Sequence, residues 1–346
     1  MTDTDPQWLA RQLLPWFDQH GRFDLPWQQP RSRYRVWVSE IMLQQTQVQT
    51  VIGYFLRFLE ALPSLPDLAA ASQDEVLALW SGLGYYSRAR NLHAAARICM
   101  QQHNCQLPGD QAALMALPGI GRSTAAAILA QADDQPLAIL DGNVKRVLAR
   151  FHAIEGWPGR SAVSQRLWQL AEAYTPAQRC ADYTQAIMDL GATVCRRQKP
   201  DCPQCPLATR CLARQQQRQQ ELPERKPKKQ RPVRQRIVLL ARTDDRWLLQ
   251  RRPPSGLWGG LFSPLIGDDR DSLLDELAAY GPGRPERCTE LDFEHAFSHF
   301  QLQAEVWQVR LNAATGVADD QLHIMTTQQA LASGLPAPIR RLFNAL

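Results

Sequence analysis

A polar, basic segment divides the chain into two kinds of sequence. Residues 213–235 are rich in Gln, Arg, Lys and Pro and lack any apolar periodicity, which predicts an extended linker and a domain boundary. From residue 5 to about residue 212, apolar residues such as Trp37, Ile41 and Val48 recur at helical spacing, and turns rich in Gly and Pro interrupt them. This half of the sequence predicts an all-α region of short helices.

The sequence after the linker has a different pattern. Residues 237–241 and 247–250 look like strands, and residues 293–311 add further strand-like alternation of apolar and polar side chains. Residues 271–280 and 338–346 look helical. The C-terminal part is therefore expected to be a smaller α+β domain.

The length and charge of the chain limit its organisation and its partners. Its 346 residues are too many for one ordinary core, since domains cluster near about 100 to 150 residues, so two or three compact units are expected. The net charge is +5, but residues 214–236 hold nine Lys or Arg against Glu221 and Glu224. Such a segment contacts a polyanion or is simply a solvated linker. No run approaches the roughly 18 apolar residues of a membrane span, so we expect a cytoplasmic protein without a membrane partner.

Four of the eight cysteines are clustered. Cys195, Cys202, Cys205 and Cys211 have the spacing C-x6-C-x2-C-x5-C within seventeen residues, in a loop whose turns contain several prolines. Disulfides are the poorer explanation in a cytosolic protein, so the thiolates are expected to bind one metal centre. The spacing alone does not choose between tetrahedral zinc and an iron-sulfur cluster, because both accept four thiolates.

A glycine-rich turn lies between two helical segments. The residues LPGIG at 117–121 follow one short helical segment and precede the strongly helical residues 124–130. At such a turn the second helix presents unpaired backbone N–H groups, and Gly119 and Gly121 would let a phosphate approach them closely. The turn is either a sequence-independent DNA contact or an ordinary corner between helices. Residues 82–90 contain a second glycine turn with nearby cationic side chains, which is a weaker candidate for the same kind of contact.

Two acidic residues are candidates for chemistry. Asp141 begins the helical segment DGNVKR, where a carboxylate normally caps a helix, and as a bare cap it would be unremarkable. Glu40 lies inside a helix between Trp37 and Ile41, and an amide-rich stretch follows at residues 44–47. A carboxylate at this position could simply face solvent.

The cysteines belong to a set of motifs that spans the chain: LPW at residues 25–27, VWVSEIMLQQTQV at 36–48, WSGLGYYSRARNLH at 80–93, LPGIGRSTA at 117–125 and LDGNVKRVLAR at 140–150. Together these motifs resemble the adenine DNA glycosylases, the MutY family of helix-hairpin-helix DNA glycosylases with a 4Fe-4S cluster. The similarity covers essentially the whole chain, and the combination of motifs is highly specific.

The resemblance implies a domain organisation. Residues 1–213 would form the mainly α catalytic region, in which residues 30–135 are a six-helix barrel and residues 1–29 join residues 136–213 in an iron-sulfur cluster domain. The basic linker would then cover residues 214–235. Residues 236–346 would form an α+β domain of the Nudix type.

The resemblance also implies a cofactor and a mechanism. One 4Fe-4S cluster would be bound by the four clustered cysteines, and Glu40 and Asp141 would face one cleft. Glu40 would protonate N7 of adenine, since adenine is a poor leaving group until then, and an apolar pocket would raise its pKa. Asp141 would stabilise the oxocarbenium-like sugar, through its charge alone or through a transient bond. Asn143 matches a position beside the sugar and the attacking water.

Two positions separate this family from relatives that remove oxidised pyrimidines and cut the strand through a Lys Schiff base. Where those lyases have Lys in the hairpin motif, this chain has Ser123, and where they have Gln, it has Glu40. Without the amine no efficient imine with the sugar is expected. Both differences indicate a monofunctional glycosylase that leaves an abasic site.

Further residues match positions that hold the extruded adenine or the DNA, because the enzyme must turn the nucleotide out of the duplex. Each of these residues also has a plain structural explanation, as a surface amide, a core aromatic residue or a simple surface charge. The adenine pocket would contain Leu25, Trp27, Gln28, Gln185 and Ser123; Gln45 and Tyr85 would be wedges, and Arg90, Lys145, Gly119 and Gly121 would contact DNA.

The C-terminal domain resembles the Nudix-type fold with which adenine glycosylases recognise 8-oxoguanine. Phe297, Ser298 and His299 match the loop that contacts the oxidised guanine, although they could also be alternate positions of an internal strand. A Nudix hydrolase needs a pair of adjacent glutamates for its metal, and the expected helix at residues 271–280 contains only Asp271, Asp275 and Glu276 as acids. Nucleotide hydrolysis is therefore not expected.

The sequence as a whole predicts a base excision repair enzyme that removes adenine paired with 8-oxoguanine or guanine. Its partners would be double-stranded DNA with these mispairs and repair proteins bound through the linker, and the protein would be a monomer. Three alternatives are a pyrimidine glycosylase with lyase activity, a zinc-stabilised DNA-binding protein without enzymatic activity, and a Nudix-type hydrolase.

Overall fold

The computed structural model describes residues 5–227, 231–253, 256–297, 299–312 and 322–346. The chain packs as two units, of which the first contains residues 1–70 and 94–228 and the second contains residues 71–93 and 229–346. The boundary between residues 228 and 229 lies inside the basic segment. No helix among these residues is long and apolar enough to cross a membrane.

The first unit is built of helices joined by short turns, as the apolar periodicity predicted. Its helices are α1 (Pro6–His20), α2 (Arg33–Leu43), α3 (Val48–Ala61), α4 (Leu65–Ala70), the second half of α6 (Ser87–Gln102), α7 (Gln111–Met115), α8 (Arg122–Asp133), α9 (Gly142–Phe151), α10 (Ser161–Tyr174), α11 (Cys180–Asp189), the π-helical turn η1 (Leu190–Val194), the short turn η2 (Cys202–Gln204) and α12 (Leu212–Gln215).

The helix that carries Glu40 is shorter than the apolar periodicity suggested. Its start is set by Ser32, whose hydroxyl accepts a hydrogen bond from the Arg35 amide at 3.2 Å. The apolar spacing continues from Trp37 to Val48, but α2 ends at Leu43, and Gln45 takes a left-handed conformation with φ 59° before α3 begins. The amide-rich stretch is therefore a turn, and its residues 44–46 line the cavity described below.

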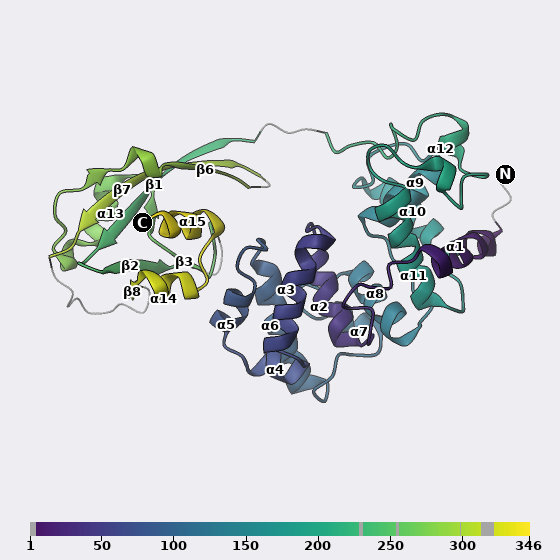
Figure 1. Ribbon diagram of the computed structural model, residues 1–346, viewed down its shortest axis with the longest axis horizontal. Helices are drawn as coiled ribbons and strands as arrows, with labels where there is room; N and C mark the ends of the chain where they lie inside the picture. The colour runs from purple at the N-terminus through teal and green to yellow at the C-terminus, as the bar shows by residue number, and fades with distance from the viewer. Residues whose placement is uncertain (1–4, 228–230, 254–255, 298, 313–321) are drawn as a thin grey trace. The chain divides into compact units, whose positions relative to one another are not determined.

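The N-terminal helix packs against helices that come much later in the chain. Figure 1 shows α1 beside α10 and α11, and these elements are in contact. Leu9, Leu13 and Phe17 of α1 are fully or almost fully buried in one core together with apolar residues of α9, such as Val144 and Leu148. Burial of each such side chain contributes about 1.5 to 3 kcal/mol, so this core fixes the start of α9.

The first part of the basic segment is folded, contrary to the extended linker that its composition predicted. Residues after α12 contact the helical unit through polar groups: the Arg150 guanidinium donates to the Leu222 carbonyl at 2.8 Å, and Glu224 accepts from the Gly156 amide at 2.7 Å. Arg218 forms an ion pair with Glu155 at 2.8 Å. Apolar periodicity does not detect contacts of this kind, because they need no apolar side chains.

The second unit contains a mixed β-sheet, which confirms the predicted α+β domain. The sheet order is β3-β2-β1-β7-β5, with β4 on β1, β6 on β7 and β8 on β2; of the strand pairs among the described residues, only β1–β7 is parallel. Its elements are α5 (Gln73–Leu79), the first half of α6, β1 (Val233–Arg242), β2 (Arg246–Arg251), β3 (Phe262–Ser263), β4 (Leu265–Gly267), α13 (Arg270–Glu276), η3 (Ala278–Tyr280), β5 (Glu286–Arg287), η4 (Thr289–Leu291), β6 (Phe293–Ala296), β7 (Gln301–Arg310), β8 (Leu322–Thr326), α14 (Thr327–Ala332) and α15 (Ala337–Ala345).

One core cluster of the second unit joins the sheet to α13. Leu239 of β1 and Val309 of β7 are buried in one cluster with Leu273, which lies in α13, and Leu277, which directly follows α13. Residues 71–93 belong to the same unit, where the Tyr86 hydroxyl donates to the Leu335 carbonyl at 3.2 Å. Nothing in the sequence pattern predicted this association of residues 71–93 with C-terminal residues.

Candidate active site

One cavity of the first unit brings together most of the predicted site. It has a volume of about 460 Å³, which lies in the range of pockets that bind small molecules and is large enough for a purine. Helices α2, α8, α9 and α11 and the turn after α2 contribute to its wall. The predicted residues that line it are Leu25, Trp27, Glu40, Gln45, Ser123, Asp141, Asn143 and Gln185.

Glu40 is a largely buried carboxyl group with one hydrogen bond among the described residues. It lies near the end of α2, is only partly exposed, and accepts a hydrogen bond at Oε1 from Gln131 Nε2 at 3.4 Å. Burial raises the pKa of Glu40 to about 7, and the nearby negative charge of Asp141 acts in the same direction, whereas the bond from Gln131 opposes them. A carboxyl group of this pKa can hold a proton at neutral pH.

The surroundings of Asp141 differ from those of Glu40, because both oxygens of Asp141 accept N–H hydrogen bonds from nearby residues. It is the N-cap of α9, as predicted: Oδ1 accepts from the Val144 amide at 2.8 Å, and Oδ2 accepts from Asn143 Nδ2 at 3.1 Å. Arg146 holds Asn143 in turn, since its Nη2 donates to Asn143 Oδ1 at 2.8 Å. A helix N-terminus with such donors favours negative charge.

The start of α9 is held close to the π-helical turn η1 by a glycine. A Cβ atom added to Gly191 would lie 2.5 Å from the Cβ of Asn143, too close for any side chain. The Gly191 carbonyl also accepts a hydrogen bond from Arg146 Nη2 at 2.6 Å. Gly191 therefore allows the approach that fixes Asn143 beside Asp141.

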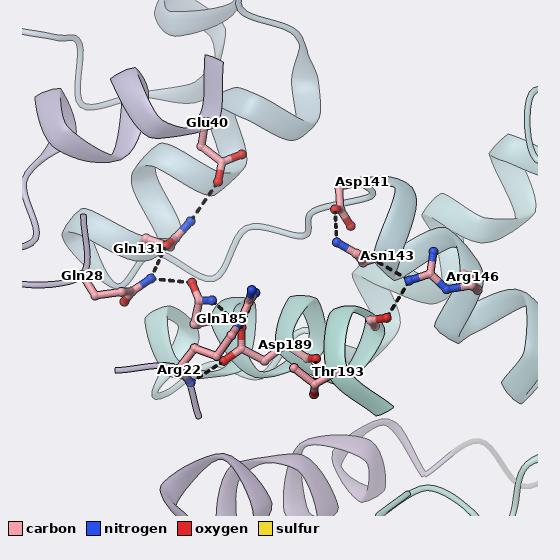
Figure 2. A network of polar contacts seen from close by, with 11 residues as sticks. Arg22, Gln28, Glu40, Gln131, Asp141, Asn143, Arg146, Gln185, Asp189 and Thr193 are labelled. Atoms are coloured by element: carbon pink, nitrogen blue, oxygen red, sulfur yellow. Dashed lines mark hydrogen bonds and ion pairs between the residues drawn. The ribbon is translucent and has the colours of Figure 1, made fainter. Parts of the chain in front are cut away.

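A buried polar network lies behind the cavity wall (Figure 2). Asp189 is fully buried and accepts from the Arg22 side chain at 2.8 Å and from Gln185 Nε2 at 2.6 Å. Gln28 is buried and donates to Gln185 Oε1 at 2.5 Å, so it supports the pocket from outside the residues that line it.

Sequence reasoning did not identify Arg22, Gln131 or Asp189 as parts of the site. Gln131 is a lone amide in the alanine-rich helix α8, and Asp189 lies one turn after Gln185 on α11. Both positions carried a weak signal, because a polar residue on an otherwise apolar helix face needs a partner when it is buried. The sequence could not show which partner each residue would find.

Ser123, the position at which the resemblance predicts the amine of a lyase, lines the cavity wall. The residue is in the first turn of α8, and its hydroxyl accepts a hydrogen bond from the Leu140 amide at 3.0 Å. This bond ties the start of α8 to the strand of chain that leads into Asp141. Gln45 reaches the same cavity from the left-handed turn after α2.

The glycine hairpin has the geometry that its sequence predicted. Helices α7 and α8 flank it, Gly119 has φ 80°, and Gly121 is the N-cap of α8 without a capping side chain. A Cβ atom added to Gly121 would meet nothing within 4 Å, so the surface there is open. The first amides of α8 are therefore accessible to an anion.

Lys145 lies in a second hollow next to the cavity. This groove of about 370 Å³ shares Gly142 with the wall of the cavity. Glu224 is the acidic residue among those that line it. The cationic residues of its lining are Lys145, Arg146, Arg150, Arg197, Arg225 and Lys226.

Two predicted DNA contacts belong to the second unit. Tyr85 is 47% exposed and has φ 46°, so its ring is available at the surface. Arg90 Nη1 donates to the Gly259 carbonyl at 2.5 Å, and burial lowers the pKa of its guanidinium. The DNA contacts assigned to these two residues stay predictions.

Phe297 and His299 of the predicted 8-oxoguanine loop lie between the end of β6 and the start of β7, so neither of these two residues is part of a strand. The Phe297 amide donates to the Phe300 carbonyl at 2.9 Å, and the two rings stack at 4.5 Å. Phe297 is partly buried and His299 is exposed, while Ser298 lies outside the described residues.

The four clustered cysteines line one small cavity of the first unit. None of them forms a disulfide, and burial raises the pKa of the Cys202 and Cys211 thiols and that of Cys205 to about 12. Arg150 is 3% exposed, and its Nη1 lies 3.3 Å from Cys195 Sγ. Among the described residues, no three His, Cys, Asp or Glu side chains are arranged to hold a single metal ion.

Comparisons with known proteins place this chain in a family. A model described as HhH-GPD superfamily base excision DNA repair protein matches residues 38–173, and a NUDIX domain model matches residues 236–345. Adenine DNA glycosylase of Buchnera aphidicola from Schizaphis graminum is 35% identical over 295 residues, or 85% of either chain. The human adenine DNA glycosylase is 37% identical over 88% of this chain and 67% of its own length.

A solved structure supports the fold of the helical unit. A thermostable thymine-DNA glycosylase superposes with a TM-score of 0.53 at 26% identity, over 60% of this chain and 95% of that protein. Both of these relatives carry the name adenine DNA glycosylase. The chain belongs to the adenine DNA glycosylase family, the MutY family of enzymes that hydrolyse N-glycosyl bonds.

Proposed function

We propose that the protein removes adenine paired with 8-oxoguanine or guanine in double-stranded DNA and leaves an abasic site. The observation that carries this proposal is the pair of carboxyl groups at one purine-sized cavity, Glu40 with a raised pKa and Asp141 with N–H donors on both oxygens. Glycoside hydrolysis needs this division between an acid and an anion. The extruded adenine would enter the cavity after it leaves the duplex.

Glu40 acts as the general acid. Its proton goes to N7 of adenine while the N9–C1′ bond breaks, so the bonding electron pair leaves with the base. Water adds to C1′ of the sugar and loses a proton, which restores the acid. The pKa of about 7 supports this role, because it keeps a large fraction of Glu40 protonated at neutral pH.

Asp141 stabilises the positive charge that develops on the sugar. Its place at the N-terminus of α9 and its bonds from Val144 and Asn143 hold the carboxylate in position before the substrate arrives. A charge fixed in advance costs no reorganisation when the transition state forms. Asn143 lines the same cavity, which supports a contact with the sugar or the water.

The enzyme stops after base removal, because the wall of the cavity carries a hydroxyl at Ser123 where a lyase has an amine. An alcohol cannot form the imine through which such relatives cut the strand.

A 4Fe-4S cluster fits the four cysteines. Four thiols line one cavity, and Arg150 is buried beside them with carbonyl oxygens and the Cys195 sulfur as its partners among the described residues. A buried guanidinium without a carboxylate requires negative charge, which metal-bound thiolates would supply. When bound, the cluster supplies a rigid crosslink for this loop.

DNA contacts follow from open or cationic surfaces. The amides at the start of α8 behind Gly119 and Gly121, together with Lys145 in its groove, would contact phosphates. Gln45 and Tyr85 would fill the gap left by the adenine. Arg90 contributes to DNA binding only after it leaves the Gly259 carbonyl.

The C-terminal unit would read the base opposite the adenine. The support is the turn at Phe297 and His299, where an aromatic ring and an exposed imidazole lie at the surface between two strands. An aromatic ring can stack on a base, and the imidazole can form a hydrogen bond to its edge. We assign 8-oxoguanine recognition to this turn, with Ser298 as its third member.

The experiment uses full-length, anaerobically prepared protein and two duplexes that differ only in 8-oxoguanine or guanine opposite adenine. We expect alkali-dependent cleavage of the adenine strand in both, and no cleavage without alkali. An absorption band near 400 nm with four irons per chain is expected of the same sample. If protein that carries this cluster leaves both duplexes uncut after alkali treatment, the proposed activity is refuted. A colourless protein with bound zinc would refute the cluster.

A further inference from the structure

A chain of side-chain amides connects a buried carboxylate to the proposed acid (Figure 2). Gln185 Nε2 donates to Asp189 at 2.6 Å, and Gln28 Nε2 donates to Gln185 Oε1 at 2.5 Å. The same Gln28 nitrogen donates to Gln131 Oε1 at 3.3 Å, and Gln131 Nε2 donates to Glu40 Oε1 at 3.4 Å. Gln28, Gln131 and Gln185 are each at most 5% exposed, so water does not replace these bonds.

The direction of every amide in this chain is fixed from outside it. The Asp189 carboxylate is paired with Arg22, and it accepts hydrogen bonds only, so Gln185 must turn its nitrogen toward it. The Arg31 guanidinium donates only, and its Nε bonds to Gln28 Oε1 at 2.9 Å. Both ends therefore direct the Gln28 nitrogen toward its two neighbours.

The orientation of Gln131 follows from that of Gln28. Because Gln28 offers it a nitrogen, Gln131 must present its oxygen to Gln28 and its own nitrogen to Glu40. Oε1 of Glu40 thus faces an N–H donor and cannot donate a proton to it. In Figure 2 the other oxygen, Oε2, points away from Gln131, toward the side on which Asp141 lies.

We propose that Gln131 is a positioning residue for the acid step, because its amide occupies one carboxyl oxygen of Glu40 and leaves the transferable proton on the other, at the cavity. This inference rests on the acid role of Glu40 under the proposed function. Gln131 does not line the cavity, so it acts on the base only through Glu40.

The same bond opposes the other influences on the proton of Glu40. Burial and Asp141 raise the pKa of Glu40, whereas the Gln131 amide lowers it, because an N–H donor stabilises the carboxylate. Arg22 and Asp141 are the charged residues that line the cavity together with Glu40. Removal of the amide should therefore make the acid release its proton at a higher pH and hold it less firmly on one oxygen.

The test is the pH dependence of single-turnover adenine excision by the full chain, measured from pH 5 to 9 on the 8-oxoguanine:adenine duplex. Gln131→Met replaces the amide by an apolar side chain of similar length. We expect the alkaline limb of the profile to move upward by roughly half to one pH unit, as the loss of one hydrogen bond implies, and the plateau rate to fall several-fold.

Two further variants separate positioning from a merely structural effect. Gln28→Met removes the donor that orients Gln131, so the limb should move in the same direction. Gln135→Met makes the same chemical change four residues beyond Gln131, where the amide donates to the Gly109 carbonyl at 3.0 Å, and should leave the profile unchanged. The melting temperature and the absorbance near 400 nm of each variant measure its folding and cluster content.

The pH profiles test the acid role of Glu40, the positioning role of Gln131 and the orientation by the amide chain separately. If the unchanged protein excises no adenine, or its rate has no alkaline limb near pH 7, the acid role of Glu40 fails. If that limb is present and Gln131→Met lowers the rate equally at all pH values, or not at all, the positioning role of Gln131 is refuted. A limb that moves for Gln131→Met but not for Gln28→Met would refute the orientation by the amide chain.

Discussion

The carboxyl groups of Glu40 on α2 and Asp141 at the N-terminus of α9 line the same cavity, and burial, together with the charge of Asp141, raises the pKa of Glu40 to about 7. The two carboxyl groups differ in the hydrogen bonds that they accept. Asp141 accepts from the Val144 amide and from Asn143, whereas Glu40 accepts one long bond from Gln131. This difference in donors, together with the burial of Glu40, assigns the acid to Glu40 and the anion to Asp141.

The rate of adenine excision should depend on pH through Glu40. A general acid works only while protonated, so the single-turnover rate should be highest below pH 7 and fall about tenfold per pH unit above it. The measurement is the excision rate between pH 5 and 9 at constant ionic strength. A rate that stays level up to pH 9 would be incompatible with Glu40 as the acid.

The stability of the protein should change over the same pH range. The folded pKa of Glu40 is raised above the ordinary value of 4.5, so the stability associated with its proton is present below pH 4.5 and is lost as the pH rises through 7. The carboxylate should cost about 1 to 3 kcal/mol at pH 8, since the side chain keeps some contact with water.

Glu40→Gln removes this titration and tests the cost directly. Its melting temperature should match that of the unchanged protein near pH 4 and exceed it by roughly 2 to 6 °C at pH 8. Glu60→Gln changes an exposed glutamate of α3 and should give no such difference. Equal melting temperatures of Glu40→Gln and the unchanged protein at pH 8 would contradict the raised pKa.

Asp141 combines a structural role with a chemical role, and two substitutions separate them. Asn caps a helix about as well as Asp, so Asp141→Asn should keep the stability of the protein, whereas Asp141→Ala should lose about 1 kcal/mol. Both remove the charge, so both should lower the excision rate at least about a hundredfold. Unfolding midpoints and single-turnover rates measure the two effects. Full activity of Asp141→Asn would show that the charge is unnecessary.

Ser123 determines whether the reaction ends at the abasic site. A lysine at this point of the cavity wall would place an amine near the sugar, so Ser123→Lys should cut the strand without alkali and form an imine that borohydride traps. Ser123→Ala serves as the control and should give neither product. Base excision by Ser123→Lys without any strand cleavage would show that position 123 does not face C1′.

Local sequence patterns predicted those parts of the fold and site that depend on nearby residues. The helices, the strands β1 and β2, and the Asp141 cap of α9 follow from periodicity and from a side chain that bonds three residues ahead. The left-handed turn at Gln45 was missed, because no glycine marks it. The grouping of Glu40 with Asp141 came from the family resemblance, since no local pattern relates residues a hundred positions apart.

The supporting network could not be predicted from the sequence. Gln131 occupies a helix rich in alanine, and its partners Gln28 and Glu40 lie about a hundred residues away. Only the packing of α8 against α2 decides that its amide reaches Glu40. The same holds for Leu222, whose carbonyl bonds to Arg150 although its surroundings in the sequence suggest an extended linker.

The acid role of Glu40 is tested most directly by Glu40→Gln on the 8-oxoguanine:adenine duplex. The amide has the same shape as the carboxyl group but cannot supply a proton, so excision should be abolished while the affinity for the duplex remains within a few-fold. The measurement pairs single-turnover excision with a binding titration of the same cluster-containing protein. A variant that excises adenine at the rate of the unchanged protein would overturn the assignment.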